Sequence, residues 1–145
     1  MMDDYEIYED NCTKIRKQNE RLLLEFEAWL QASGLSKKTI ENHVSNIDFY
    51  VNEYLLYEDA VEARDGAVSI DDFLGYWFIR KTMWASRTSI KSNATSLKKF
   101  YIFMLEKGFI DEVELADLKH AITDCMPEWL ATLEGYNDRN YSASC

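Results

Sequence analysis

One stretch limits the possible folds of this chain more than any other: SRTSIKSNATSLKKFYIFMLEKG, from Ser86 to Gly108. Apolar side chains recur in it at steps of three and four residues, which is the spacing of one face of an α-helix. Ser86 suits the N-cap position, and Gly108 suits the left-handed position that ends a helix. The stretch therefore predicts one long amphipathic helix with a core-facing stripe. This stripe consists of Ile90, Ala94, Leu97, Tyr101 and Met104.

The opposite face of this helix is basic and rich in hydroxyl groups. From Arg80 to Lys107 the chain carries seven basic residues against Glu106, a net charge of +6. The whole chain has a formal net charge of −10, so the remainder carries −16. Such segregation indicates one positive surface on an acidic body, and the ordinary alternative is a solvated helix face. A sequence pI of about 4.6 counts against strong non-specific binding of nucleic acid by the molecule as a whole.

The composition favours an all-helical protein. One Pro and five Gly are present in 145 residues, and 47% of the residues are hydrophobic, enough for a core. Helical periodicity predicts further helices at about 13–32, 37–57, 69–81 and 111–134. Three N-caps are expected: Ser36, Ser69 with Asp72 in a capping box, and Asp111 with Glu114. Pro127 is expected to kink the last helix or to begin a new turn, and Gly135 to end it. We expect an all-α fold: a compact bundle of four to five helices with a C-terminal helical extension.

The chain length suits one domain, which we place at residues 13–135. Residues 1–12 are acidic and are expected to form a flexible arm, and residues 136–145 to form a polar tail. No apolar run reaches the roughly 20 residues needed to cross a bilayer. The N-terminus lacks the pattern of a signal peptide, and the three cysteines are too widely spaced for a disulfide framework. We therefore expect a cytoplasmic protein without membrane contact.

No group of residues has the pattern of a catalytic or metal site. The scattered glycines make no phosphate-binding loop. His43 and His120 are the two histidines of the chain, and neither has a partner at a zinc-ligand spacing. We expect no enzymatic activity, no cofactor and no metal. Trp77, Trp84 and Trp129 are compatible with a ligand pocket or, as is more common, with the hydrophobic core.

Three segments, in this order, resemble one family. LSKKTIENHVSNIDFY, from Leu35, is similar to the "GLS.nTi..y...l..F" segment of tyrosine recombinases (phage integrases). SIKSNATSLKKFYIFML, from Ser89, resembles the "TinrrlsaLrsFyrfl...G.I" helix of that family, and the chain continues as EKGFI. Between them, SIDDFL from Ser69 resembles the short "it..di..fl" helix. The match covers about residues 22–110 and is specific as a whole, whereas each piece by itself is only an amphipathic helix.

The resemblance implies the N-terminal core-binding (SAM-like) domain of these enzymes, in which the second and fourth helices face duplex DNA. Basic side chains there would release counterions from phosphates, and hydroxyl and amide groups would position the backbone. We expect salt-dependent binding of modest affinity and limited sequence specificity. By motif position, the candidate DNA-binding residues are Lys37, Lys38, Thr39 and Asn42 on the second helix, and Arg87, Ser89, Lys91, Ser92, Thr95, Lys98 and Lys99 on the fourth.

In one respect the 145 residues depart from the family pattern, and we expect the protein to lack the family's catalytic function. Tyrosine recombinases need a second domain with an Arg, Lys, His-x-x-Arg and Tyr set, and neither His43 nor His120 is followed by Arg at the third position. We therefore expect a non-catalytic DNA-binding module. We favour a stand-alone accessory protein over a fragment of a longer recombinase. Its expected partners are duplex DNA and either a full-length recombinase or a second copy of itself.

The alternative is a protein–protein interaction module that retains the fold without binding DNA. Residues 111–145 carry a net charge of −6, which would repel DNA or face away from it. The segment from Met126 to Leu130 contains Trp129, and an exposed Trp is a typical interface anchor. Burial of Trp129 in the core would instead make this segment part of the domain's own packing.

Overall fold

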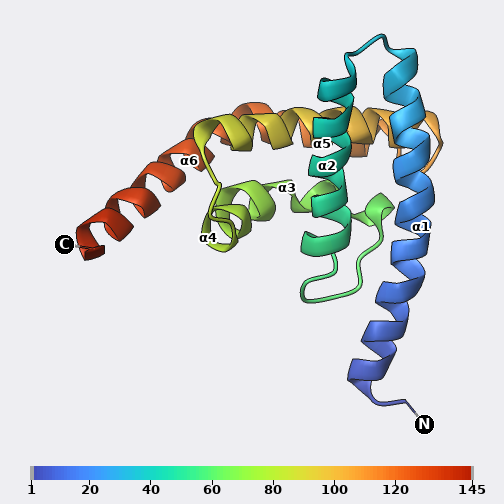
Figure 1. Cartoon of the computed structure of the whole chain (residues 1–145), viewed down its shortest axis with the longest axis horizontal. Helices are drawn as coiled ribbons and strands as arrows, with labels where there is room; N and C mark the ends of the chain where they lie inside the picture. Colours follow the sequence, from blue (N-terminus) through green and yellow to red (C-terminus); the bar gives the residue numbers. More distant parts are fainter. Residues whose placement is uncertain (1, 145) are drawn as a thin grey trace.

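The computed structural model describes residues 2–144, and the side chains of residues 2–139. Within this range the chain consists of helices and connecting loops, so the predicted all-α bundle is confirmed (Figure 1). No helix within residues 2–144 is both long enough and apolar enough to cross a bilayer. The α-helices are α1 (Asp4–Ala32), α2 (Lys37–Phe49), α3 (Ile70–Asp72), α4 (Phe78–Lys81), α5 (Arg87–Glu106) and α6 (Glu112–Ser144).

Helices α1 and α2 form an antiparallel pair that crosses α5 (Figure 1). Gly34, at φ +79°, makes the turn between the pair. The ring of Phe26 on α1 is fully buried and lies 5.3 Å from the ring of Phe100 and 5.6 Å from that of Phe103, both on α5. These aromatic contacts hold the pair on α5, and α6 packs along another side of α5.

Helix α5 agrees with its prediction at both ends and along its stripe. The Ser86 hydroxyl accepts a hydrogen bond from the backbone N–H of Ser89, and the Ser89 hydroxyl accepts one from that of Ser86, which is a complete capping box. Gly108 adopts φ +79° and closes the helix with bonds from Gly108 and Phe109 to the last carbonyls. The five predicted stripe residues are buried.

Two π-helical turns contact each other through their aromatic side chains. One, Tyr50–Tyr54, continues α2, and the other, Phe73–Trp77, joins α3 to α4 in one helical segment at 70–81. A π-turn widens the helix and is frequent at functional sites. The ring of Tyr54 lies 4.8 Å from that of Phe73 and 5.2 Å from that of Trp77. The predicted capping box at the start of this segment is absent, because Asp72 accepts a hydrogen bond from the Tyr54 hydroxyl instead.

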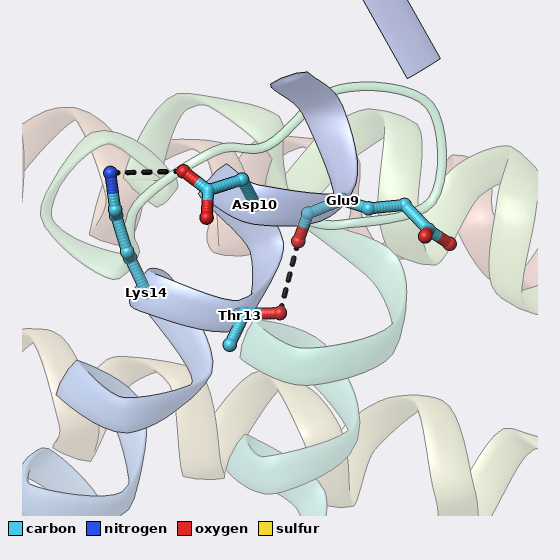
Figure 2. A network of polar contacts seen from close by, with 4 residues as sticks. All are labelled: Glu9, Asp10, Thr13 and Lys14. Atoms are coloured by element: carbon cyan, nitrogen blue, oxygen red, sulfur yellow. Dashed lines mark hydrogen bonds and ion pairs between the residues drawn. The ribbon is translucent and has the colours of Figure 1, made fainter. Parts of the chain in front are cut away.

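The acidic N-terminal segment, expected as an arm with the first helix starting at residue 13, is the beginning of α1. Asp3 caps the helix by accepting a hydrogen bond from the N–H of Glu6 at 2.8 Å. Figure 2 shows the following turns: Asp10 pairs with Lys14 at 3.0 Å, and Thr13 donates to the Glu9 carbonyl. Cys12 is buried against Ile15 and Leu56, and this contact with the turn that follows Tyr50–Tyr54 stabilises the added turns.

The predicted helix end at Gly135 and the loose tail after it are wrong as far as Ser144, because α6 continues through both Pro127 and Gly135. Proline in a helix interior costs about 3 kcal/mol. Trp129 and Leu133 are 1% and 2% exposed, and burial of a large apolar side chain contributes about 1.5–3 kcal/mol. Packing of the residues that follow the proline therefore offsets its cost. The last turns extend away from the rest of the molecule (Figure 1).

Candidate nucleic-acid interface

The two helices that carry the expected DNA-binding residues meet at a buried polar crossing. Nδ1 of His43 on α2 lies 2.7 Å from Oγ of Ser96 on α5. The Asn46 amide donates to the hydroxyls of Ser92 and Ser96 at 3.2 and 3.0 Å. These contacts place the middle of α2 against the middle of α5 and fix the two candidate sets on adjoining surfaces.

The outward face of α5 carries unpaired positive charge. Lys91, Thr95 and Lys98 are exposed, and Lys99 is half-buried beside α2. Among the side chains of residues 2–139, these lysines form no ion pair within 4.0 Å. Thr95 donates its hydroxyl to the Lys91 carbonyl and keeps its acceptor positions outward. This face is therefore available to a polyanion.

The start of α2 adds a second set of basic groups. Lys37, Lys38 and Asn42 are exposed, and Thr39 is half-buried. The N-cap Ser36 accepts a hydrogen bond from the N–H of Thr39 and donates to its hydroxyl. Positive charge at a helix N-terminus is unfavourable by a few tenths of a kcal/mol, but the unpaired N–H groups there also attract anions. A phosphate near Lys37 and Lys38 would remove this unfavourable interaction.

Three of the expected residues are already engaged within the protein. Arg87 forms an ion pair with Glu134 of α6 at 2.9 Å. The Ser89 hydroxyl completes the α5 capping box, and the Ser92 hydroxyl accepts from Asn46. Because these groups have partners, their contribution to an external ligand is smaller than that of the free lysines.

The sequence reasoning did not assign His43 a place in this surface. His43 is 8% exposed, and its burial, together with the nearby Lys99 charge, lowers its pKa. It is thus neutral at neutral pH and orders the hydroxyl of Ser96. The signal available in the sequence was the pair of polar residues, His43 and Asn46, three apart on the side of α2 next to its apolar stripe.

Acidic groups border this surface on α2. Glu41 and Asp48 are exposed, seven residues apart on one face of the helix. Asp48 accepts a hydrogen bond from Asn52 at 2.5 Å. On α5, Glu106 lies at the far end and accepts from the indole of Trp29. The positive surface is therefore continuous along α5 and mixed along α2.

The segment from Met126 to Leu130 packs on the domain itself. Trp129 is 1% exposed, and its indole N–H donates to Asp71 at 2.6 Å. Trp129 is therefore part of the core and is not an exposed anchor for a partner. Among the described residues, no three His, Cys, Asp or Glu side chains lie together in an arrangement that would hold a metal ion.

Comparison with family models, with curated proteins and with solved structures found no match for this chain.

Proposed function

We propose that this chain is a non-catalytic DNA-binding module of the tyrosine-recombinase core-binding type, which contacts duplex DNA through α2 and α5. The observation that carries the proposal is the outward face of α5, where Lys91, Lys98 and Lys99 lie without a carboxylate partner among the described side chains. The resemblance of the segments around Leu35, Ser69 and Ser89 to that family supports it. The module acts in the cytoplasm, with a full-length recombinase or with a second copy of itself.

The spacing of the lysines on α5 suits contact with different phosphates of one DNA strand. Lys91 and Lys98 are two helical turns apart, about 10.5 Å along the axis. Phosphates of one DNA strand follow one another at about 3.4 Å along the duplex axis. The two ammonium groups therefore reach different phosphates, and the start of α2 supplies Lys37 and Lys38 beside them. The acidic remainder of the chain limits the total affinity and orients the protein with α5 toward DNA.

The experiment is fluorescence anisotropy with a labelled duplex over a range of salt concentrations. Changing Lys91, Lys98 and Lys99 together to Gln is expected to lower the affinity at low salt and to reduce the slope of log K against log[salt] by about 3. The matched control changes Arg16, Lys17 and Lys119 to Gln, an equal charge change at exposed positions on α1 and α6. Equal losses in both triple variants, or no binding by the wild type at low salt, would refute the α5 interface.

A protein partner is the second candidate function, and a groove between α5 and α6 favours it. This groove has a volume of about 440 Å³ and is lined by Met126, Pro127, Leu130 and Ala131, with Lys91 at its edge. In this alternative the chain keeps the same fold, binds a partner protein in the groove and does not bind DNA. The anisotropy measurement separates the two functions, because this alternative expects no salt-dependent DNA binding.

A further inference from the structure

A cavity of about 240 Å³ lies between the helical segment at 70–81 and the chain from Tyr54 to Val61, which follows the π-helical turn after α2. It is formed by residues that the DNA-binding proposal does not use. Four of its lining side chains are aromatic: Tyr54, Tyr57, Tyr76 and Trp77. Tyr57 and Tyr76 are more than half exposed, so core packing does not account for their rings.

Two of the phenol rings that line the cavity pack against the indole of Trp77. The ring of Tyr54 lies 5.2 Å from the Trp77 ring at an angle of 72°, and the ring of Tyr57 lies 5.5 Å from it at 74°. Two phenol rings thus stand nearly perpendicular to one indole. Faces of aromatic rings carry partial negative charge, and several inclined faces together attract one cation.

Carboxylates give the same cavity a negative charge. Glu58, Asp59 and Asp72 line it, and all three are exposed. Asp72 accepts a hydrogen bond from the Tyr54 hydroxyl at 2.5 Å. Burial of Tyr54, together with Asp72 and Glu58, raises its pKa, so its phenol is neutral at neutral pH. An anionic ligand is disfavoured here.

Two cations of the chain already lie on the rings at the edge of this cavity. The ammonium nitrogen of Lys81 is 5.2 Å from the centre of the Tyr57 ring. The guanidinium carbon of Arg80 is 4.0 Å from the centre of the Tyr76 ring. Neither side chain forms an ion pair with Glu58, Asp59 or Asp72 within 4.0 Å. The ring faces themselves therefore accept positive charge.

We propose that this cavity binds a methylated ammonium group, which the Tyr54, Tyr57 and Trp77 rings enclose and the carboxylates neutralise. A quaternary ammonium group fits better than a metal ion, because four aromatic side chains line the cavity and the carboxylates of the described residues are not grouped as metal ligands. It also needs no hydrogen-bond acceptors, unlike a primary ammonium group. The group is carried either by a small molecule such as choline or by a trimethylated lysine of another protein.

The first test is a titration with choline chloride at constant ionic strength, followed by the indole N–H signal of Trp77 in a ¹H–¹⁵N NMR spectrum. A saturable shift is expected. The matched neutral compound is 3,3-dimethylbutan-1-ol, in which a carbon replaces the charged nitrogen of choline. Its affinity should be lower than that of choline by a factor of roughly two to five, or by more. Absence of a saturable shift, or equal binding of the neutral alcohol, would overturn the proposal.

The second test uses variants of exposed side chains, because such substitutions change the cavity without disturbing the core that the fold needs. Tyr57→Leu removes one wall and should weaken choline binding roughly two- to fivefold. Lys81→Gln removes the cation that competes for the Tyr57 ring and should strengthen it. Tyr5→Leu, at an exposed tyrosine of α1, is the control and should change nothing. Unaltered binding in Tyr57→Leu, or weaker binding in Lys81→Gln, would contradict the proposed site.

A final comparison identifies the source of the ligand. A peptide with one trimethyl-lysine and uncharged flanking residues is titrated beside choline. Tighter binding of the peptide assigns the site to a modified protein, and tighter binding of choline assigns it to a small molecule. DNA binding by Tyr57→Leu should equal that of the wild type, so failure of either proposal leaves the other testable.

Discussion

The imidazole Nδ1 of His43 and the hydroxyl of Ser96 lie 2.7 Å apart where α2 crosses α5. Ser96 is fully buried and also accepts a hydrogen bond from Asn46. Because this polar contact lies in the interior, it has geometric requirements that apolar packing lacks. It thereby fixes how the lysines of α5 are placed relative to those at the start of α2.

The His43 contact should make the stability depend on pH. Burial and the Lys99 charge lower the pKa of His43 in the folded state, whereas in the unfolded chain it is about 6.5. The unfolded state therefore binds more protons below about pH 7, and the stability falls as the pH drops through 6.5 toward the folded pKa. Urea unfolding at about pH 7.5 and about pH 5 should show a smaller loss for His43→Gln than for the wild type. The exposed His120→Gln is the control, and an equal loss in His43→Gln would disprove the assignment.

Removing the Ser96 hydroxyl should destabilise the crossing. Ser96→Ala leaves the buried His43 ring nitrogen and the Asn46 amide without their shared partner. An unsatisfied buried polar group costs about 1–3 kcal/mol, and this loss is expected in urea unfolding at neutral pH. Ser45→Ala, at an exposed position on α2, should leave the stability unchanged or slightly raised. A Ser96→Ala protein as stable as Ser45→Ala would show that the contact contributes nothing.

Releasing Arg87 from its ion pair should strengthen DNA binding. In Glu134→Gln the guanidinium loses its carboxylate partner and becomes available to a phosphate. The slope of log K against log[salt] should steepen by up to about 1, as expected for one further phosphate contact. The pair is exposed, so the free energy of unfolding should change by less than about 1 kcal/mol. Glu128→Gln removes an equal charge from α6 and serves as control; an equal gain there would point to net charge and not to Arg87.

Gly75 should be intolerant of a methyl group because of Trp129. A Cβ atom added to Gly75 would lie 2.7 Å from Cδ1 of the Trp129 ring. Gly75→Ala is therefore expected to cost about 1–3 kcal/mol through overpacking. In a Trp129→Leu background the same change should cost less, and a double-mutant cycle by urea unfolding measures this coupling. Additive losses would mean that the indole does not restrict this position.

Both ends of α5 and the starts of α2 and α6 are the parts of the fold that the sequence predicted best. Ser86 and Gly108 bound α5, and Asp111 forms a capping box with Glu114 at the start of α6. The α2 cap at Ser36 was predicted equally well. These signals are local, since a cap needs groups only three or four residues apart. The periodic apolar stripe can likewise be recognised within one helix, whichever element it packs against.

The predictions that were wrong depended on distant contacts. From the sequence we expect Pro127 and Gly135 to interrupt or end the last helix, but burial of Trp129 and Leu133 keeps α6 continuous. The acidic beginning of α1 read as an arm, but Cys12 packs against Leu56. In both places a local preference of a few kcal/mol or less is outweighed by burial against residues far away in the chain.

The candidate DNA-binding residues divide in the same way. The sequence by itself determined that α5 has a basic outward face, because helical periodicity places Lys91, Thr95 and Lys98 together. Only the tertiary structure decided that Arg87 pairs with Glu134, and that Tyr54 and Trp77 enclose a cavity. The physical reason is range: hydrogen bonding and periodicity within one helix are fixed over a few residues. Which side chains meet across helices is set by how the whole core packs.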